Sequence, residues 1–179
     1  MSDETAGRAR IDVGETFPAV QLPATTGGIL DPVADSAGDF VLFVYPRTGR
    51  TDRPEDDDWA LIPGAKGCTA ESSEFRDLAA DFARIGLRIY GLSTQDTDDQ
   101  REAAERLHLP YPLLSDQELT LRDLLGVPTF RYDGVELYRR STVVVRAGVV
   151  VWAEWGILDA ESHPRALLAD LAGQAPGTS

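Results

Sequence analysis

The sequence has one cysteine, two histidines and no apolar run that approaches the length of a membrane span. A single cysteine, Cys68, excludes an internal disulfide and a Cys-x-x-Cys redox pair. With two histidines far apart in the sequence, this thiol is also a poor zinc ligand, so we expect no metal. Residues 1–15 are polar and lack the apolar core of a secretory signal, which indicates a cytoplasmic protein.

Positive charge is also scarce. The chain has 17 lysine and arginine residues against 30 aspartate and glutamate residues, for a net charge of −13. Because nucleic acids and anionic membranes attract basic patches, we expect neither as a partner. The 179 residues, 42% of them hydrophobic, suffice for one domain. We assign it to residues 14–172, with flexible tails at residues 1–13 and 173–179.

The rest of the chain alternates apolar strands with amphipathic helices. Residues 40–45 are continuously apolar, as in a strand covered on both faces, and residues 87–93 form a second apolar run. Residues 69–85 between them have helical spacing, so the two strands should be parallel. The remaining predicted elements are helices at 97–108 and 114–126, a hairpin turning at Asp133-Gly134, strands on either side of Ala147-Gly148, and a terminal helix within 161–173.

This order predicts a thioredoxin-like α/β fold, with a mixed central sheet flanked by helices on both faces. Cys68 then begins a helix at the sheet edge where open α/β sheets hold their chemistry. A helix N-terminus favours a negative charge, and therefore the reactive thiolate. A cation strengthens this effect, and Lys66 and Arg140 are the candidates. The alternative is a buried, inert cysteine.

A long irregular segment, residues 47–67, precedes the cysteine. Such a length without periodicity is typical of a functional or lid-like loop. Its acidic cluster at residues 55–58 fits a solvated surface better than a cation site.

Four segments carry a further pattern: GCTAESSEFRD at 67–77, LPYPLLSD at 109–116, RSTVVV at 140–145 and VYPRTG at 44–49. In their order along the chain they resemble the peroxiredoxin family, in particular its bacterioferritin-comigratory or Q-type branch. The first resembles the peroxidatic segment, in which Cys-Thr opens a helix. The resemblance extends over about residues 14–172, which makes coincidence a poor explanation.

The resemblance implies a thiol-dependent peroxidase without a cofactor. Cys68 would be the nucleophile that attacks a hydroperoxide and becomes a sulfenic acid. Arg140 would hold the thiolate and polarise the peroxide, Glu71 would orient Arg140, and Pro46 would shield the cysteine. Further residues expected at the substrate pocket are Gly67, Thr69, Thr48, Thr51 and Trp155.

Two departures from the family pattern concern this pocket. Ala65 stands where the family has a Thr or Ser whose hydroxyl holds the peroxide. The interval from Pro46 to Cys68 is also about fifteen residues longer than in the family pattern. Thr48 or Thr51 would replace the hydroxyl if the loop folds back, and a role of these threonines in turns is the alternative.

The third departure concerns recycling. Many members of this branch have a second cysteine at the position of Ser73. Because serine cannot resolve a sulfenic acid, we expect an external thiol as reductant, either a low-molecular-weight thiol or a thioredoxin-like protein. Cys68 of a second protomer is the least favoured reductant. The chain is expected to be a monomer or a homodimer.

Two other functions fit the same residues. In the first, the thioredoxin-like scaffold and the reactive cysteine serve a different sulfur or redox reaction. The lengthened loop before Cys68 suggests such a change of substrate. A non-enzymatic binding module fits an inert Cys68 with the acidic loop as its contact surface. A thiol pKa near the free value of about 8.5 would support the binding module.

Overall fold

Strand β3, Phe40–Val44, lies at the centre of the sheet because all five of its side chains are apolar and fully buried. The strand order is β5-β4-β3-β8-β9. β3 pairs in parallel with β4, Arg88–Ser93, and antiparallel with β8, Ser141–Arg146. The outer strands are β5, Leu113–Ser115, and β9, Val149–Trp155. The predicted mixed sheet with a parallel central pair is confirmed.

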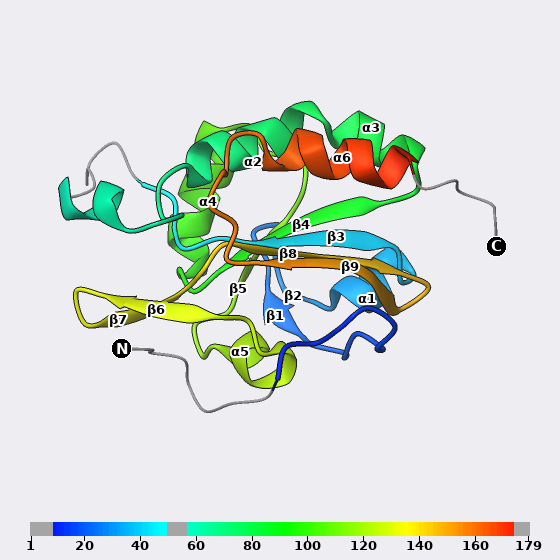
Figure 1. Cartoon of the computed structure of the whole chain (residues 1–179), viewed down its shortest axis with the longest axis horizontal. Coiled ribbons are helices and arrows are strands. Elements are labelled where there is room, and N and C mark those ends of the chain that lie inside the picture. The colour runs from blue at the N-terminus through cyan, green and yellow to red at the C-terminus, as the bar shows by residue number, and fades with distance from the viewer. Residues whose placement is uncertain (1–8, 50–56, 174–179) are drawn as a thin grey trace.

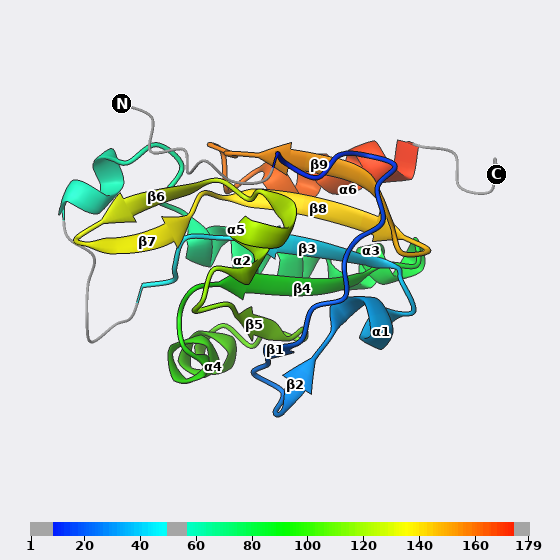
Figure 2. The same ribbon diagram turned by 90° about the horizontal axis from the view of Figure 1, so that it is seen from below.

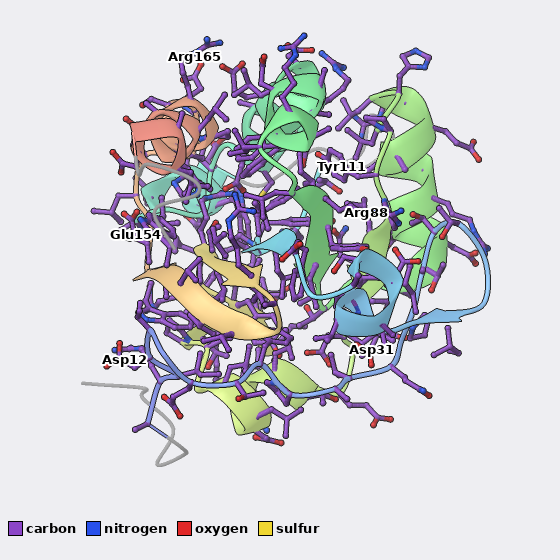
Figure 3. The ribbon with its side chains drawn as sticks, turned by 90° about the vertical axis from the view of Figure 1, so that its right-hand side faces the viewer. Asp12, Asp31, Arg88, Tyr111, Glu154 and Arg165 are labelled. Atoms are coloured by element: carbon purple, nitrogen blue, oxygen red, sulfur yellow. The ribbon has the colours of Figure 1, made fainter. Side chains whose placement is uncertain are left out.

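This computed structural model describes residues 9–49 and 57–173, and Figure 1 shows helices above and below the sheet. One face is covered by α2, Cys68–Asp77, α3, Ala79–Arg84, and α6, His163–Gly173. The other face carries α1, Pro32–Ser36, and α5, Thr120–Leu125. Helix α4, Thr97–Arg106, packs beside β5 (Figure 2). Within the described ranges no helix has the length and apolar character needed to cross a membrane.

Smaller elements lie around the central sheet. They are the two-residue strands β1, Leu22–Pro23, and β2, Ile29–Leu30, the 3-10 helix η1, Asp57–Leu61, and the hairpin strands β6, Thr129–Tyr132, and β7, Val135–Tyr138. The predicted hairpin is confirmed: Asp133 and Gly134 at its turn have φ of 53° and 78°. Two consecutive positive φ values characterise the tight turns that match strand twist.

The predicted helix over residues 69–85 is divided in two. Leu78, with φ −99° and ψ 4°, separates α2 from α3. The side chains of Phe75, Leu78 and Phe82 all join one core cluster beneath these helices. Helical spacing alone does not detect this break, because the apolar residues keep the same spacing on both sides of Leu78.

The predicted helix over residues 114–126 is wrong in its first part. Leu113–Ser115 is instead strand β5, which extends the sheet because its residues pair with β4 and are buried. Helix α5 begins only at Thr120. Asp116, one of the two predicted caps, accepts hydrogen bonds from the N–H groups of the first two residues of α5. Gly126, with φ 75°, ends the helix as predicted.

Part of the predicted N-terminal tail contacts the rest of the domain. Ile11 is buried, and its N–H donates to the carbonyl oxygen of Leu125. Residues 1–8 and 174–179 lie outside the described residues, as do Glu55 and Asp56 of the acidic cluster. The domain limits themselves stay a prediction.

Candidate active site

Cys68 is the first residue of α2, and the conformation of Gly67 places it there. Gly67 has φ 104°, a region that favours glycine, and a Cβ at this position would lie 2.9 Å from Cβ of Ala160. The Gly67 carbonyl accepts the N–H of Glu71 at 2.8 Å and so closes the first turn. The thiol therefore lies at the N-terminus of a ten-residue helix, where backbone N–H groups favour the thiolate.

Arg140 is the cation that contacts the cysteine. Its Nη2 lies 3.3 Å from Cys68 Sγ, and the residue is 1% exposed. The guanidinium also donates to the carbonyl oxygens of residues 64, 65 and 66, at 3.1 to 3.3 Å. One side chain thus holds both the sulfur and the segment that leads to it. Lys66, the other candidate, has an exposed side chain and contributes only its carbonyl.

Glu71 holds Arg140 from the other side, as the resemblance implies. Its Oε1 accepts a hydrogen bond from Arg140 Nη1 at 2.5 Å, and both side chains are fully buried. Burial raises the pKa of Glu71 to about 7, while the guanidinium opposes that rise. Glu71 Oε2 is buried and has no hydrogen-bond partner within the described residues. Two acidic groups, the thiol and this carboxyl, therefore share one guanidinium.

The charge state of Cys68 depends on these neighbours. Burial raises the pKa of the thiol, and the negative charge of Glu71 raises it further. The Arg140 guanidinium and a hydrogen bond from the backbone N–H of Arg47 lower the pKa. In a buried site only such partners can stabilise the thiolate, so its reactivity depends on Arg140.

The threonines expected at the pocket lie in different places. Thr48 is buried, and its N–H and hydroxyl lie 3.0 and 3.3 Å from Gln95 Oε1. Its hydroxyl is therefore engaged by the loop after β4. The Thr69 side chain is exposed. Thr51 lies outside the described residues.

Trp155 lies on the opposite face of the sheet from Cys68, and Pro46 follows the end of β3. Pro46 is buried, two residues after the end of β3. Cys68 belongs to the core cluster between the sheet and α2, α3 and α6, whereas Trp155 packs against the cluster on the opposite face. The expectation that Trp155 lines the pocket is therefore not met, because strand alternation turns its ring away. Trp152, at the alternate position, faces the Cys68 side.

An aromatic cluster holds the segment before Cys68, and the sequence analysis missed it. Trp59 of η1 is 5% exposed and lies against the rings of Phe130 and Tyr132 in the β6–β7 hairpin. The Arg47 guanidinium lies 4.3 Å from the Trp59 ring centroid. Ala65, where the family has a hydroxyl residue, is buried in the same cluster. The one available signal was a tryptophan within an acidic segment.

His163 is a second residue that sequence reasoning missed. Its Nε2 lies 2.9 Å from Thr142 Oγ1, and its ring lies near those of Phe75 and Trp152. Burial, with the positive charge of Arg140, lowers the pKa of His163 to about 4. This histidine is therefore neutral at neutral pH and closes the core behind the site.

The chain is similar in sequence to known proteins. The AhpC/TSA family pattern matches residues 60–153. A protein of Mycobacterium tuberculosis strain H37Rv, named "putative peroxiredoxin", is 34% identical over 133 residues, which cover 74% of this chain and 77% of that protein. Chloroplastic peroxiredoxin Q of Arabidopsis thaliana is 34% identical over 142 residues, 79% of this chain and 58% of that protein.

Solved structures show the same fold. Peroxidoxin BcpB of Mycobacterium tuberculosis has a TM-score of 0.73 and 28% identity, covering 93% of this chain and 99% of its own. PrxQ of Xylella fastidiosa has a TM-score of 0.75 over 93% and 98% of the two chains, and at 18% identity it shows the fold alone. The predicted thioredoxin-like fold is confirmed.

Proposed function

This chain belongs to the AhpC/TSA family of peroxiredoxins and is a thiol-dependent peroxidase, and we propose that Cys68 is its peroxidatic nucleophile. The observation that carries this proposal is the buried contact of 3.3 Å between Cys68 Sγ and Arg140 Nη2. Cys68 is the only thiol in the chain. The repurposed scaffold and the binding module are not favoured, since the relatives are peroxiredoxins.

The geometry supports an in-line displacement at the peroxide. The Cys68 thiolate attacks one oxygen of the hydroperoxide, the S–O bond forms as the O–O bond breaks, and the departing alkoxide or hydroxide takes up a proton. Cys68 becomes a sulfenic acid, and the peroxide is reduced to an alcohol or water. Arg140 stabilises both the thiolate and the leaving oxygen, while Glu71 orients Arg140.

The remaining pocket residues receive lesser roles. Pro46 shields the sulfur. The burial of Pro46, two residues after the end of β3, supports this role. Gly67 and Thr69 flank the cysteine and contribute backbone near the substrate. Thr48 or Thr51 supplies the hydroxyl that Ala65 lacks, and for Thr48 this requires exchange of its hydrogen bond to Gln95.

The reductant is an external thiol, either a low-molecular-weight thiol or a thioredoxin-like protein, because the chain has no second cysteine. The protein works as a monomer or homodimer in the cytoplasm, where a reducing environment keeps a lone thiol free. The net charge of −13 supports the absence of nucleic-acid and membrane partners.

Trapping of the sulfenic acid tests the proposal. The reduced protein is mixed with one equivalent of hydrogen peroxide, quenched with dimedone and analysed by intact-protein mass spectrometry. We expect one adduct at Cys68, formed much faster than on free cysteine, and no adduct in Cys68→Ser. Adduct formation no faster than on free cysteine would refute Cys68 as the nucleophile.

A further inference from the structure

The reductant must reach a sulfur that the fold covers. Cys68 is 4% exposed, and its Sγ lies against Arg140 and, at 3.6 Å, the carbonyl oxygen of Ala65. The segment 64–67 leads directly to the sulfur, and Arg140 holds the carbonyl groups of residues 64, 65 and 66. An external thiol therefore reaches the oxidised sulfur only when this segment moves.

A hollow of about 420 Å³ lies along the same segment. One wall consists of residues 62–64, 66, 67 and 70, and the other is the loop 158–161 between β9 and α6. The walls meet where Gly67 approaches Ala160, and Figure 1 shows this loop passing beside the start of α2. The volume is that of a site for a small molecule. The part of the chain that must move is thus also a wall of this hollow.

Opposite charges stand on the two walls. Lys66 is the only lysine in the chain, its side chain is exposed, and it forms no ion pair within the described residues. Across from it, Asp159 and Glu161 are exposed on the second wall. The Asp159 carboxylate accepts hydrogen bonds from Ser162. Apolar side chains, including Ile62 and Leu158, line the space between them.

We propose that this hollow binds the reductant, a low-molecular-weight thiol that carries both a carboxylate and an ammonium group. Lys66 pairs with the carboxylate, and Glu161 and Asp159 pair with the ammonium group. The inference rests on the proposed function of Cys68. A small thiol fits better than a protein because the hollow is small and, among the residues that the structure describes, its lining has a single cation facing carboxylates, as a zwitterion of amino-acid size requires.

Two thiols complete the cycle. The first attacks the sulfenic acid of Cys68, an S–S bond forms, the S–O bond breaks, and the hydroxyl leaves as water with the thiol proton. A second thiol attacks the mixed disulfide, which releases a low-molecular-weight disulfide and returns Cys68 to the thiol. The two electrons that reduce the peroxide therefore come from two thiol molecules.

Charge reversal tests this site without depending on overall activity. Cys68 is oxidised with one equivalent of hydrogen peroxide at low ionic strength and mixed with 3-mercaptopropionate, cysteamine, cysteine or 2-mercaptoethanol. Loss of the sulfenic acid is followed by dimedone quenching and mass spectrometry. Comparison of each thiol between variants cancels differences in thiol pKa. The variants are Lys66→Glu, Glu161→Lys and, as the matched charge control, Arg84→Glu at an exposed position of α3.

Lys66→Glu should slow the anionic mercaptopropionate and accelerate the cationic cysteamine, each by up to about fivefold relative to 2-mercaptoethanol. Glu161→Lys should change these ratios in the opposite sense, and Arg84→Glu should leave them unchanged. A loss of structure would change the rates with all thiols in the same direction. Rate changes in opposite directions for the anionic and the cationic thiol therefore support this binding site.

Equal ratios in all variants would overturn the inference, as would reduction by a thioredoxin alone, which would make the hollow part of a protein interface. In both results the sulfenic acid still forms, so the proposed function stands. Failure of Cys68 to form a sulfenic acid would instead refute the proposed function.

Discussion

Arg140 and Cys68 lie 72 positions apart in the sequence and 3.3 Å apart in the fold, at Nη2 and Sγ. The sheet register explains this contact. Val44, the last residue of β3, pairs with Ser141, the first residue of β8. Arg140 therefore stands at the edge of the sheet where β3 ends and α2 begins. The antiparallel pairing of two central strands brings the cation to the thiol.

Loss of Arg140 should slow oxidation of Cys68. In the proposed mechanism Arg140 stabilises the thiolate and the leaving oxygen, so in Arg140→Ala the rate constant with hydrogen peroxide should fall about 10²- to 10³-fold in stopped-flow measurements. Arg139→Ala is the matched control, because the Arg139 guanidinium lies over the Phe130 ring instead. Arg140→Lys is a second variant, which keeps the buried positive charge. Circular dichroism checks that each variant is folded. An equal loss in Arg139→Ala would contradict the assignment.

Removal of the Glu71 charge should lower the pKa of Cys68. The Glu71 carboxylate raises that pKa, and a glutamine amide oxygen can still accept a hydrogen bond from Arg140. The pH profile of iodoacetamide alkylation should shift to lower pH in Glu71→Gln. Glu74→Gln, on the same helix with its carboxylate paired to Arg165, is the control and should leave the profile in place. A shift to higher pH would show that Glu71 acts on the thiol mainly by orienting Arg140.

Protonation of His163 should destabilise the fold in acid. The pKa of His163 is lowered to about 4 from 6.5, so the unfolded state binds more protons between these values. Stability from this residue is present above pH 6.5 and is lost as pH falls to 4, by about 3 kcal/mol. Urea unfolding across this range should show a weaker pH dependence in His163→Gln.

The chain offers a matched control for that measurement. His108, the other histidine, is exposed beyond the end of α4, so His108→Asn should keep the wild-type pH dependence of unfolding. If His163→Gln follows the wild-type curve as well, the acid sensitivity comes from other groups.

Trp59 should hold the segment before Cys68 in place. Trp59→Ala removes a buried ring that packs on the β6–β7 hairpin and on Arg47, at a cost of about 3 kcal/mol in local packing. Hydrogen exchange should become faster across residues 57–67. Oxidation of Cys68 should slow, because the Arg47 N–H that stabilises the thiolate loses its support. Leu61→Ala, a change at a 79% exposed residue of the same segment, should alter neither measurement.

Local patterns determined most of the elements. The buried strand 40–44, the Asp133-Gly134 turn and the start of a helix at the cysteine follow from apolar runs, turn chemistry and helical spacing. The end of α4 also depends on local contacts. His108 has φ 54°, and the Leu109 N–H donates a hydrogen bond to the Ala104 carbonyl, which is the pattern of a Schellman motif. Such features depend on neighbouring residues, so the sequence shows them directly.

Strand β5 and the break at Leu78 could not be predicted in this way. Leu113–Ser115 is too short for a strand pattern and becomes a strand only because β4 offers an unpaired edge. At Leu78 the apolar spacing continues through the break, so periodicity cannot locate it. In both places contacts with distant residues override local preference.

By itself the sequence determined that one sulfur, that of Cys68, is available for thiol chemistry and that no second cysteine of the chain can pair with it. One cysteine at a helix start allows a single reactive sulfur, and Ser73 removes an internal partner. Only the tertiary structure decided which neighbours act on that sulfur. It buried Glu71 against Arg140, turned Trp155 to the opposite face and joined Trp59 to Arg47. These contacts join residues far apart in the chain, and strand register and core packing, not local spacing, decide which of them meet.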